Sequence, residues 1–157
     1  MRKHWQSLSC CILLTLVSSS SASTLDHMCK YVARTNKDIG YDYCIKFFQA
    51  DKASATANNH GLGVVATQIS RAAASDTLKR IDTLMALEKD KKIHAHLSDK
   101  YTIFSRRRTS TVNAVVSDTY TRENGFRVLG VTSPLATEDA KFLKDCSIAL
   151  IITSTFW

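Results

Sequence analysis

Proline and glycine are scarce in this chain, which has one proline, Pro134, and five glycines among 157 residues. The turns that join the short strands of a β-sandwich or β-barrel are rich in these two residues. Their scarcity therefore disfavours an all-β fold. No internal repeat or low-complexity segment is visible, and the length suits one domain with a single core.

The motifs that mark common active sites are also missing. The chain has no His-Glu-x-x-His, no Cys-x-x-Cys, no glycine-rich phosphate loop and no Gly-x-Ser-x-Gly. His94 and His96 lie two residues apart, so on a helix they point in different directions and do not predict a metal site. We therefore expect no catalytic residues, no metal and no cofactor, and we expect that the protein is not an enzyme.

Long hydrophobic runs are absent, and a short one lies near the start of the chain. Two basic residues precede eight apolar residues at 10–17, and small residues follow at 18–22. This order is typical of a secretory signal peptide, and the run is well short of the roughly 20 residues that span a bilayer. We expect residues 1–22 to be removed, and the mature chain, 23–157, to be extracellular with no membrane attachment.

Positive charge exceeds negative charge moderately. Without the leader the chain keeps 19 of its 21 basic residues against 14 acidic ones, a net charge of +5. The densest basic run is Arg106-Arg107-Arg108. A secreted chain has little access to nucleic acid, so we expect no nucleic-acid partner and favour a solvated surface for this run. Binding of an anionic polymer such as pectin is the alternative.

Apolar residues recur at helical spacing through most of the mature chain. Residues 25–48 predict two short helices around a turn at 36–40. Three further helices are expected, at residues 62–87, 93–104, and from Ser133-Pro134 or a cap at Thr137 to the end.

The remaining segments are less helical in pattern. A small shift of the apolar stripe near 74–76 is one that a long helix can absorb by curving. Residues 109–120 are ambiguous because β-branched residues are frequent there. Loops or turns are expected at residues 51–59, 88–92 and 123–133.

Four pieces of the sequence together resemble the plant invertase and pectin methylesterase inhibitor family. They are the leader and residues 28–54, 60–70 and 133–154. The likeness is greatest to the pollen-expressed invertase-inhibitor branch, some of whose members are allergens. The most specific part is the cysteine pair in 28–54, with an aromatic residue before its second cysteine and an aspartate shortly after the Phe-Phe pair.

The resemblance implies an all-α fold, with an N-terminal helical hairpin (23–50) followed by an up-down, antiparallel four-helix bundle (60–157). It also implies a disulfide within the hairpin, and this pairing carries over onto Cys29 and Cys44. Both cysteines would then be structural. The third mature cysteine, Cys146, falls in the last helix, where a buried free thiol is favoured and an intermolecular bridge is the alternative.

The chain departs from the family in the middle of the bundle. The positions of the second family disulfide are occupied by Lys100 and Arg122, which cannot form a crosslink and would repel each other if they met. The stretch between them is about twenty residues shorter than in the family, which at 3.6 residues per turn removes roughly five turns of helix. We therefore expect a bundle truncated in its middle.

The family acts by occlusion, because its helical surface docks on a secreted enzyme and blocks substrate entry. The resemblance thus implies a secreted inhibitor whose partner is an acid invertase or a pectin methylesterase of the plant cell wall, with activity weakened by the shortened region. Two alternatives stay open: a non-inhibitory, allergen-like pollen or storage protein, and a cationic wall-binding protein acting through residues 106–108. The partner-binding residues and the oligomeric state are not predicted.

Overall fold

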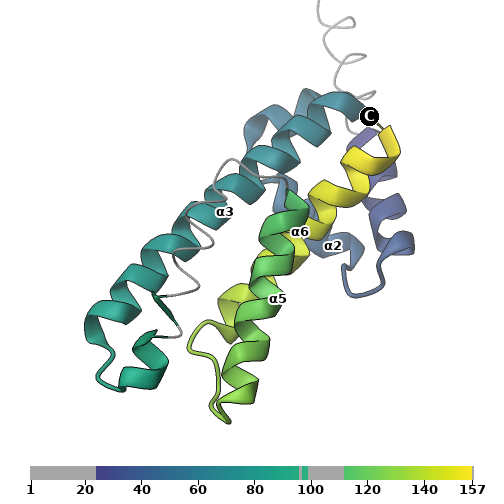
Figure 1. The fold of residues 1–157 in the computed structure, drawn as a ribbon. Helices are drawn as coiled ribbons and strands as arrows, with labels where there is room; N and C mark the ends of the chain where they lie inside the picture. The colour runs from purple at the N-terminus through teal and green to yellow at the C-terminus, as the bar shows by residue number, and fades with distance from the viewer. Residues whose placement is uncertain (1–23, 96, 99–111, 157) are drawn as a thin grey trace, which may run out of the picture. The chain divides into compact units, whose positions relative to one another are not determined.

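The computed structural model describes residues 24–95, 97–98 and 112–156. All secondary structure in these ranges is helical, which confirms the predicted all-α fold (Figure 1). The predicted leader and the arginine run at 106–108 lie outside the described residues. None of the described helices is both long and apolar enough to span a membrane.

The described helices follow one another along the chain as given below. The first covers residues 24–35 and a short one covers residues 91–98, of which 96 is not described. The others are α2 (Tyr41–Phe48), the 3-10 helix η1 (Lys52–Thr56), α3 (Asn59–Leu87), α5 (Val112–Val128) and α6 (Ala136–Phe156).

The chain forms two compact units, which divide inside α3 and inside α6. The first unit, called here the hairpin unit, comprises residues 24–65 and 151–156. The second, called the bundle unit, comprises the described residues of Ala66–Leu150. The last turns of α6 therefore belong with the N-terminal hairpin.

The hairpin unit contains the predicted pair of short helices, and its turn is built around Asn36. The Asn36 side-chain oxygen accepts a hydrogen bond from the Asp38 N–H at 3.0 Å, and its carbonyl accepts one from the Ile39 N–H at 3.1 Å. Such Asx turns reverse the chain without glycine in a strained conformation. The turn predicted at 36–40 is thus present.

The core of the hairpin unit is apolar and includes the C-terminal end of the chain. The Phe47 and Phe48 rings pack edge to face, with centroids 5.1 Å apart. Tyr31 contacts Phe156 in the same way at 5.7 Å. Buried aliphatic side chains complete this core: Met28, Val32, Ile39, Leu62, Val65 and Ile152.

The bundle unit contains parts of α3 and α6, the short helix at 91–98, and α5. One apolar cluster joins Leu78 of α3 to Phe142 and Cys146 of α6, with valines of α5 packed against it. A second cluster contains Ile81, Leu97, Phe126 and Leu135. These residues come from α3, the short helix at 91–98, α5 and the connection that leads into α6.

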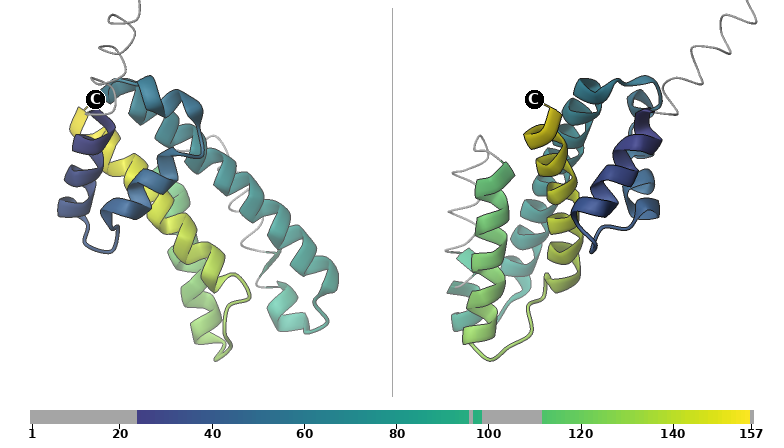
Figure 2. Two further views of the ribbon diagram at one scale, coloured as in Figure 1. Left: turned by 180° about the vertical axis from the view of Figure 1, so that it is seen from behind. Right: turned by 90° about the vertical axis from the view of Figure 1, so that its right-hand side faces the viewer.

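Contacts within the bundle unit also give the helix directions. Residues 70 and 80 of α3 contact residues 145 and 138 of α6, so these two helices are antiparallel. The two apolar clusters pair later positions of α3 with later positions of α5, so α3 and α5 run in the same direction. The colour gradients of the ribbon follow the same directions (Figure 1, Figure 2).

The loop predicted for residues 123–133 is wrong over its first half, because α5 continues to Val128. Gly125, which suggested the loop, lies inside the helix, where glycine costs roughly 0.5–1 kcal/mol relative to alanine but need not end the helix. The ambiguous segment at 109–120 is helical from Val112 onward.

Gly130 is the residue that ends α5. Its φ of 70° lies in the left-handed region. The Gly130 N–H donates to the Arg127 carbonyl at 3.1 Å, and the Val131 N–H donates to the Phe126 carbonyl at 3.2 Å. This double hydrogen bond is the Schellman motif, in which the residue after the helix adopts a conformation that glycine favours. It gives the α5–α6 connection a defined geometry.

The other helix ends differ slightly from the predicted ones. The predicted loop at 51–59 contains η1, and α3 begins at Asn59 because the Asn58 side chain accepts from the Gly61 N–H at 2.8 Å, an N-cap contact. The stripe shift near 74–76 does not interrupt α3. Ser133 and Pro134 form a turn ahead of α6, and Thr137 lies inside the helix rather than at its cap.

Candidate functional site

Cys29 and Cys44, the two site residues taken from the sequence, are bonded to each other in the hairpin unit. Cys29 lies on the helix at 24–35 and Cys44 on α2, and their Cα atoms are 5.5 Å apart. Both side chains are fully buried. The bond closes a sequence separation of 15 residues and fixes the two hairpin helices to each other.

A polar contact joins the same two helices on the surface. One Asp26 carboxylate oxygen accepts from the Tyr41 hydroxyl at 2.9 Å, and the other accepts from the Lys30 ammonium at 2.8 Å. These hydrogen bonds, that of Lys30 first, lower the pKa of Asp26. The contact is exposed, so it contributes little stability by itself.

The two histidines whose spacing does not predict a metal site lie on and near the short helix, and only one of them is described. His94 is exposed on the short helix, and His96 is not described. In the described ranges no three His, Cys, Asp or Glu side chains form a group that could hold a metal ion.

Cys146 is a free, buried thiol on α6, as the favoured interpretation predicts. It packs against Leu78 and Phe142 in the first apolar cluster. Burial, assisted by the neighbouring Asp145 charge, raises the pKa of the Cys146 thiol to about 12. A thiol with so high a pKa stays protonated at physiological pH and is a poor nucleophile.

The sequence analysis missed the main polar feature of the bundle unit, an ion pair between Arg122 of α5 and Asp139 of α6. Only 1% of each side chain is exposed. The Arg122 Nε donates to Asp139 Oδ2 at 3.0 Å, and Arg122 Nη2 donates to Asp139 Oδ1, so the contact is bidentate. The sequence predicted only that Arg122 would repel Lys100 if the two met in the fold. Lys100 lies outside the described residues.

A second carboxylate lies beside this pair. Glu123 accepts from the Ser133 hydroxyl at 2.6 Å, and the same hydroxyl oxygen accepts from the Leu135 N–H at 3.2 Å. Burial first, and a hydrogen bond with Glu123 second, raise the pKa of Asp139 to about 7 against the opposing effect of Arg122. The charged cluster of Arg122, Asp139 and Glu123 therefore joins α5, the connection and α6.

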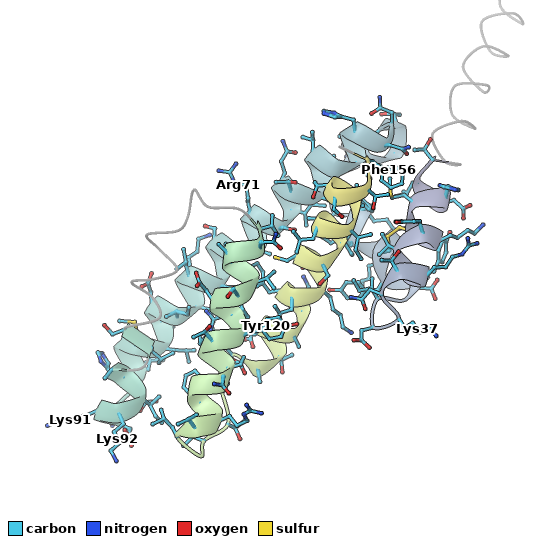
Figure 3. The ribbon with its side chains drawn as sticks, turned by 45° about the vertical axis from the view of Figure 1, so that its right-hand side comes forward. Lys37, Arg71, Lys91, Lys92, Tyr120 and Phe156 are labelled. Atoms are coloured by element: carbon cyan, nitrogen blue, oxygen red, sulfur yellow. A yellow bond between two sulfur atoms is a disulfide. The ribbon has the colours of Figure 1, made fainter. Side chains whose placement is uncertain are left out.

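Exposed apolar side chains lie from the middle of α5 to the connection after it. We call Tyr120, Val128, Leu129 and Val131 the apolar turn surface. Val128 is 78% exposed and Tyr120 is 61% exposed. Tyr120 and Val131 also line a shallow groove of about 500 Å³ with Phe126 at its wall. Figure 3 labels Tyr120 on α5. Exposed apolar groups that cluster in this way are typical of protein-binding surfaces.

A second groove of about 420 Å³ lies between α3 and α6 in the bundle unit. Small and apolar residues, Ala72, Ala73 and Phe142, form part of its lining. The charges at its edge pair with one another: Arg80 lies 3.8 Å from Glu138, and Lys141 lies 2.7 Å from Asp145. Such internally paired charges leave little net field for a charged ligand.

Comparison with known proteins identifies plant relatives of this chain. No protein-family model matches the chain. A protein of Platanus acerifolia named "Putative invertase inhibitor" is 27% identical over 161 residues, covering 90% of each chain. A protein of Platanus orientalis with the same name is 25% identical over 166 residues, covering 94% of this chain and 95% of that protein. The chain is thus similar to these plant proteins along nearly its whole length, which confirms its resemblance to the invertase and pectin methylesterase inhibitor family.

Proposed function

We propose that the protein is a secreted inhibitor that binds a plant cell-wall enzyme and occludes its active site. The observation that carries this proposal is the similarity to two proteins named as invertase inhibitors over nine tenths or more of both chains. The all-helical fold with a disulfide-bonded hairpin supports it, because a protein that acts by occlusion needs a preorganised surface rather than reactive groups.

Acid invertase is the first target to test, because both relatives carry that name, and pectin methylesterase is the second. The mature chain, 23–157, is titrated into each purified enzyme at acidic pH. We expect a saturable loss of invertase activity at a fixed stoichiometry. Loss of pectin methylesterase activity alone would reassign the target. No effect on either enzyme at large molar excess would reject inhibition and favour the allergen-like accumulation protein.

We propose that inhibition is weaker than that of the Platanus proteins. The support is the shortened region between Lys100 and Arg122, because a bundle with fewer helical turns offers less rigid surface to a partner. A side-by-side titration with the Platanus acerifolia protein measures this directly. Equal inhibition constants would reject the weakening and leave the inhibitory function itself intact.

We propose the apolar turn surface as part of the contact with the target. It is exposed, apolar and held by the Schellman motif, as the anchors of a protein interface require. Replacing Val128 with Asp should weaken inhibition at least about tenfold without changing the thermal unfolding midpoint. The matched control is Leu87→Asp, because Leu87 is 71% exposed at the end of α3 and lies outside this surface. Equal losses in both variants would reject the assignment.

The cationic wall-binding function is the second candidate, and the distribution of charge favours it. Residues 99–111 carry four basic and one acidic side chain, so this segment supplies +3 of the net +5 of the mature chain. Binding to pectin should weaken with salt and should vanish in an Arg106/Arg107/Arg108→Ala variant. Unchanged pectin binding in that variant would remove this function.

A further inference from the structure

The charged cluster of the bundle unit contains one buried cation, Arg122, one buried carboxylate, Asp139, and one half-buried carboxylate, Glu123. Arg122 forms a bidentate pair with Asp139, and both side chains are only 1% exposed. Glu123 lies next to them and holds the connection through the Ser133 hydroxyl at 2.6 Å. With both carboxylates ionised, these three side chains sum to a net charge of −1.

Burying a charge that no opposite charge balances is unfavourable in free energy. A proton held between two carboxyl groups removes that charge. In the described chain, Arg122 and Glu123 of α5 face Asp139 directly, and Asp118 lies one turn earlier on α5. On α6, the neighbouring Glu138 pairs with Arg80 of α3 instead. The α3 and 91–98 segments contribute apolar side chains to this end of the unit, Ile81 and Leu97 among them.

We propose that Arg122, Asp139 and Glu123 form a proton-operated lock on the connection between α5 and α6. At acidic pH the Asp139 carboxyl is protonated and hydrogen-bonded to Glu123, the cluster is neutral, and the connection is held. When that proton leaves, Glu123 and Asp139 repel each other and the connection loosens. The proton passes to solvent and no other bond is made or broken.

The connection is the part of the fold that this lock can move. It runs from Gly130 to Leu135, and its side-chain anchor to α5 is the Ser133–Glu123 hydrogen bond. Two residues of the apolar turn surface, Leu129 and Val131, flank Gly130. Loosening would therefore disturb that surface first. The inference goes beyond the proposed inhibition and does not need it, because the lock is tested on the free protein.

The sign of the pH effect follows from the direction of the pKa shift. The pKa of Asp139 is raised to about 7 in the folded protein from an ordinary value of 3.8. A carboxyl whose pKa is raised on folding favours the folded state below its unfolded pKa, and this contribution is lost as pH rises through the folded pKa. The connection should thus be tightest near pH 4–5 and should loosen between about pH 6 and 8.

The test is amide hydrogen exchange of the mature protein at pH 5.5 and pH 8, corrected for the intrinsic effect of pH on exchange. We expect the protection factors of residues 128–135 to fall at least about tenfold at the higher pH. A tenfold change in an equilibrium constant is what a shift of one pKa unit corresponds to. Protection in the middle of α3 should change much less. Equal protection of residues 128–135 at the two pH values would overturn the proposal.

Two variants separate the lock from general acid stability. Glu123→Gln removes the second carboxyl, so Asp139 pairs with Arg122 at every pH and the pH effect should disappear. Glu138→Gln removes an exposed carboxyl from the adjacent position and should leave the effect intact. Asp139→Asn leaves the buried Arg122 guanidinium without its carboxylate and can unfold the unit. The proposal is therefore tested with Glu123→Gln and Glu138→Gln. A Glu123→Gln protein that keeps the full pH effect would overturn the proposal.

Discussion

The two units of this protein hold their helices together by opposite chemical means. In the hairpin unit, a disulfide between Cys29 and Cys44 joins the helix at 24–35 to α2. In the bundle unit, a buried ion pair between Arg122 and Asp139 joins α5 to α6. A covalent bond is indifferent to pH and salt but sensitive to reductant. A buried ion pair is indifferent to reductant but depends on the protonation of its partners.

The family resemblance implies a cysteine at the position of Arg122. In this chain Arg122 instead contacts α6 through its charge. The ion pair makes the stability of the bundle unit a function of pH, whereas the disulfide of the hairpin unit does not depend on pH in this way.

The largest expected effect comes from breaking the ion pair on one side. Replacing Arg122 with Ala leaves the Asp139 carboxylate buried without its cation, which should lower the free energy of unfolding by about 3–5 kcal/mol in urea denaturation. The control is Arg127→Ala on the exposed side of α5, expected to cost under about 0.5 kcal/mol.

A double variant sharpens this first prediction. Replacing Arg122 with Met and Asp139 with Leu removes both charges together, so it should recover much of the loss, because a well-packed apolar pair avoids the desolvation of two ions. A double variant as unstable as Arg122→Ala would mean that the loss came from packing rather than from charge.

The disulfide should have the next largest effect. Replacing both Cys29 and Cys44 with Ala removes a crosslink over a sequence separation of 15 and should destabilise the protein by about 3 kcal/mol on the chain-entropy model. Reductant should lower the unfolding midpoint of the parent protein and leave that of the variant unchanged. A parent protein insensitive to reductant would contradict the role given to the disulfide.

The smallest effect belongs to the turn between α5 and α6. Gly130 has a φ of 70°, a conformation that alanine adopts only with strain. Gly130→Ala should therefore cost about 1 kcal/mol in urea denaturation. Gly125→Ala is the matched comparison, because Gly125 lies inside α5 and the same change there should be neutral or stabilising by up to about 1 kcal/mol. Identical effects at both positions would contradict the Schellman assignment.

Local features of the fold were predictable where one residue acts on its near neighbours. The turn around Asn36 and the long apolar stripe of α3 follow from spacing alone. The end of α5 could have been placed by the same reasoning, because Gly130 follows a basic residue at the expected distance for a C-terminal cap. The glycine inside α5 hid this signal, since Gly125 suggested a loop before the true helix end was reached.

The charged cluster could not be predicted in the same way. Arg122 and Asp139 are 17 residues apart, on different helices. The sequence places Asp139 in the first turn of a helix, where an exposed carboxylate is favourable, and nothing in its neighbours indicates burial beside an arginine. Pairing and burial here depend on how α5 and α6 meet.

The sequence by itself determined the helical class, the hairpin and the family resemblance, because these rest on periodicity, turn residues and motif spacing within short stretches of chain. Only the tertiary structure decided that Arg122 finds Asp139, that Glu123 lies beside them, and that the apolar side chains after Val128 remain exposed. Charges and apolar groups take their energies from their surroundings, and those surroundings are assembled only when helices distant in sequence pack together.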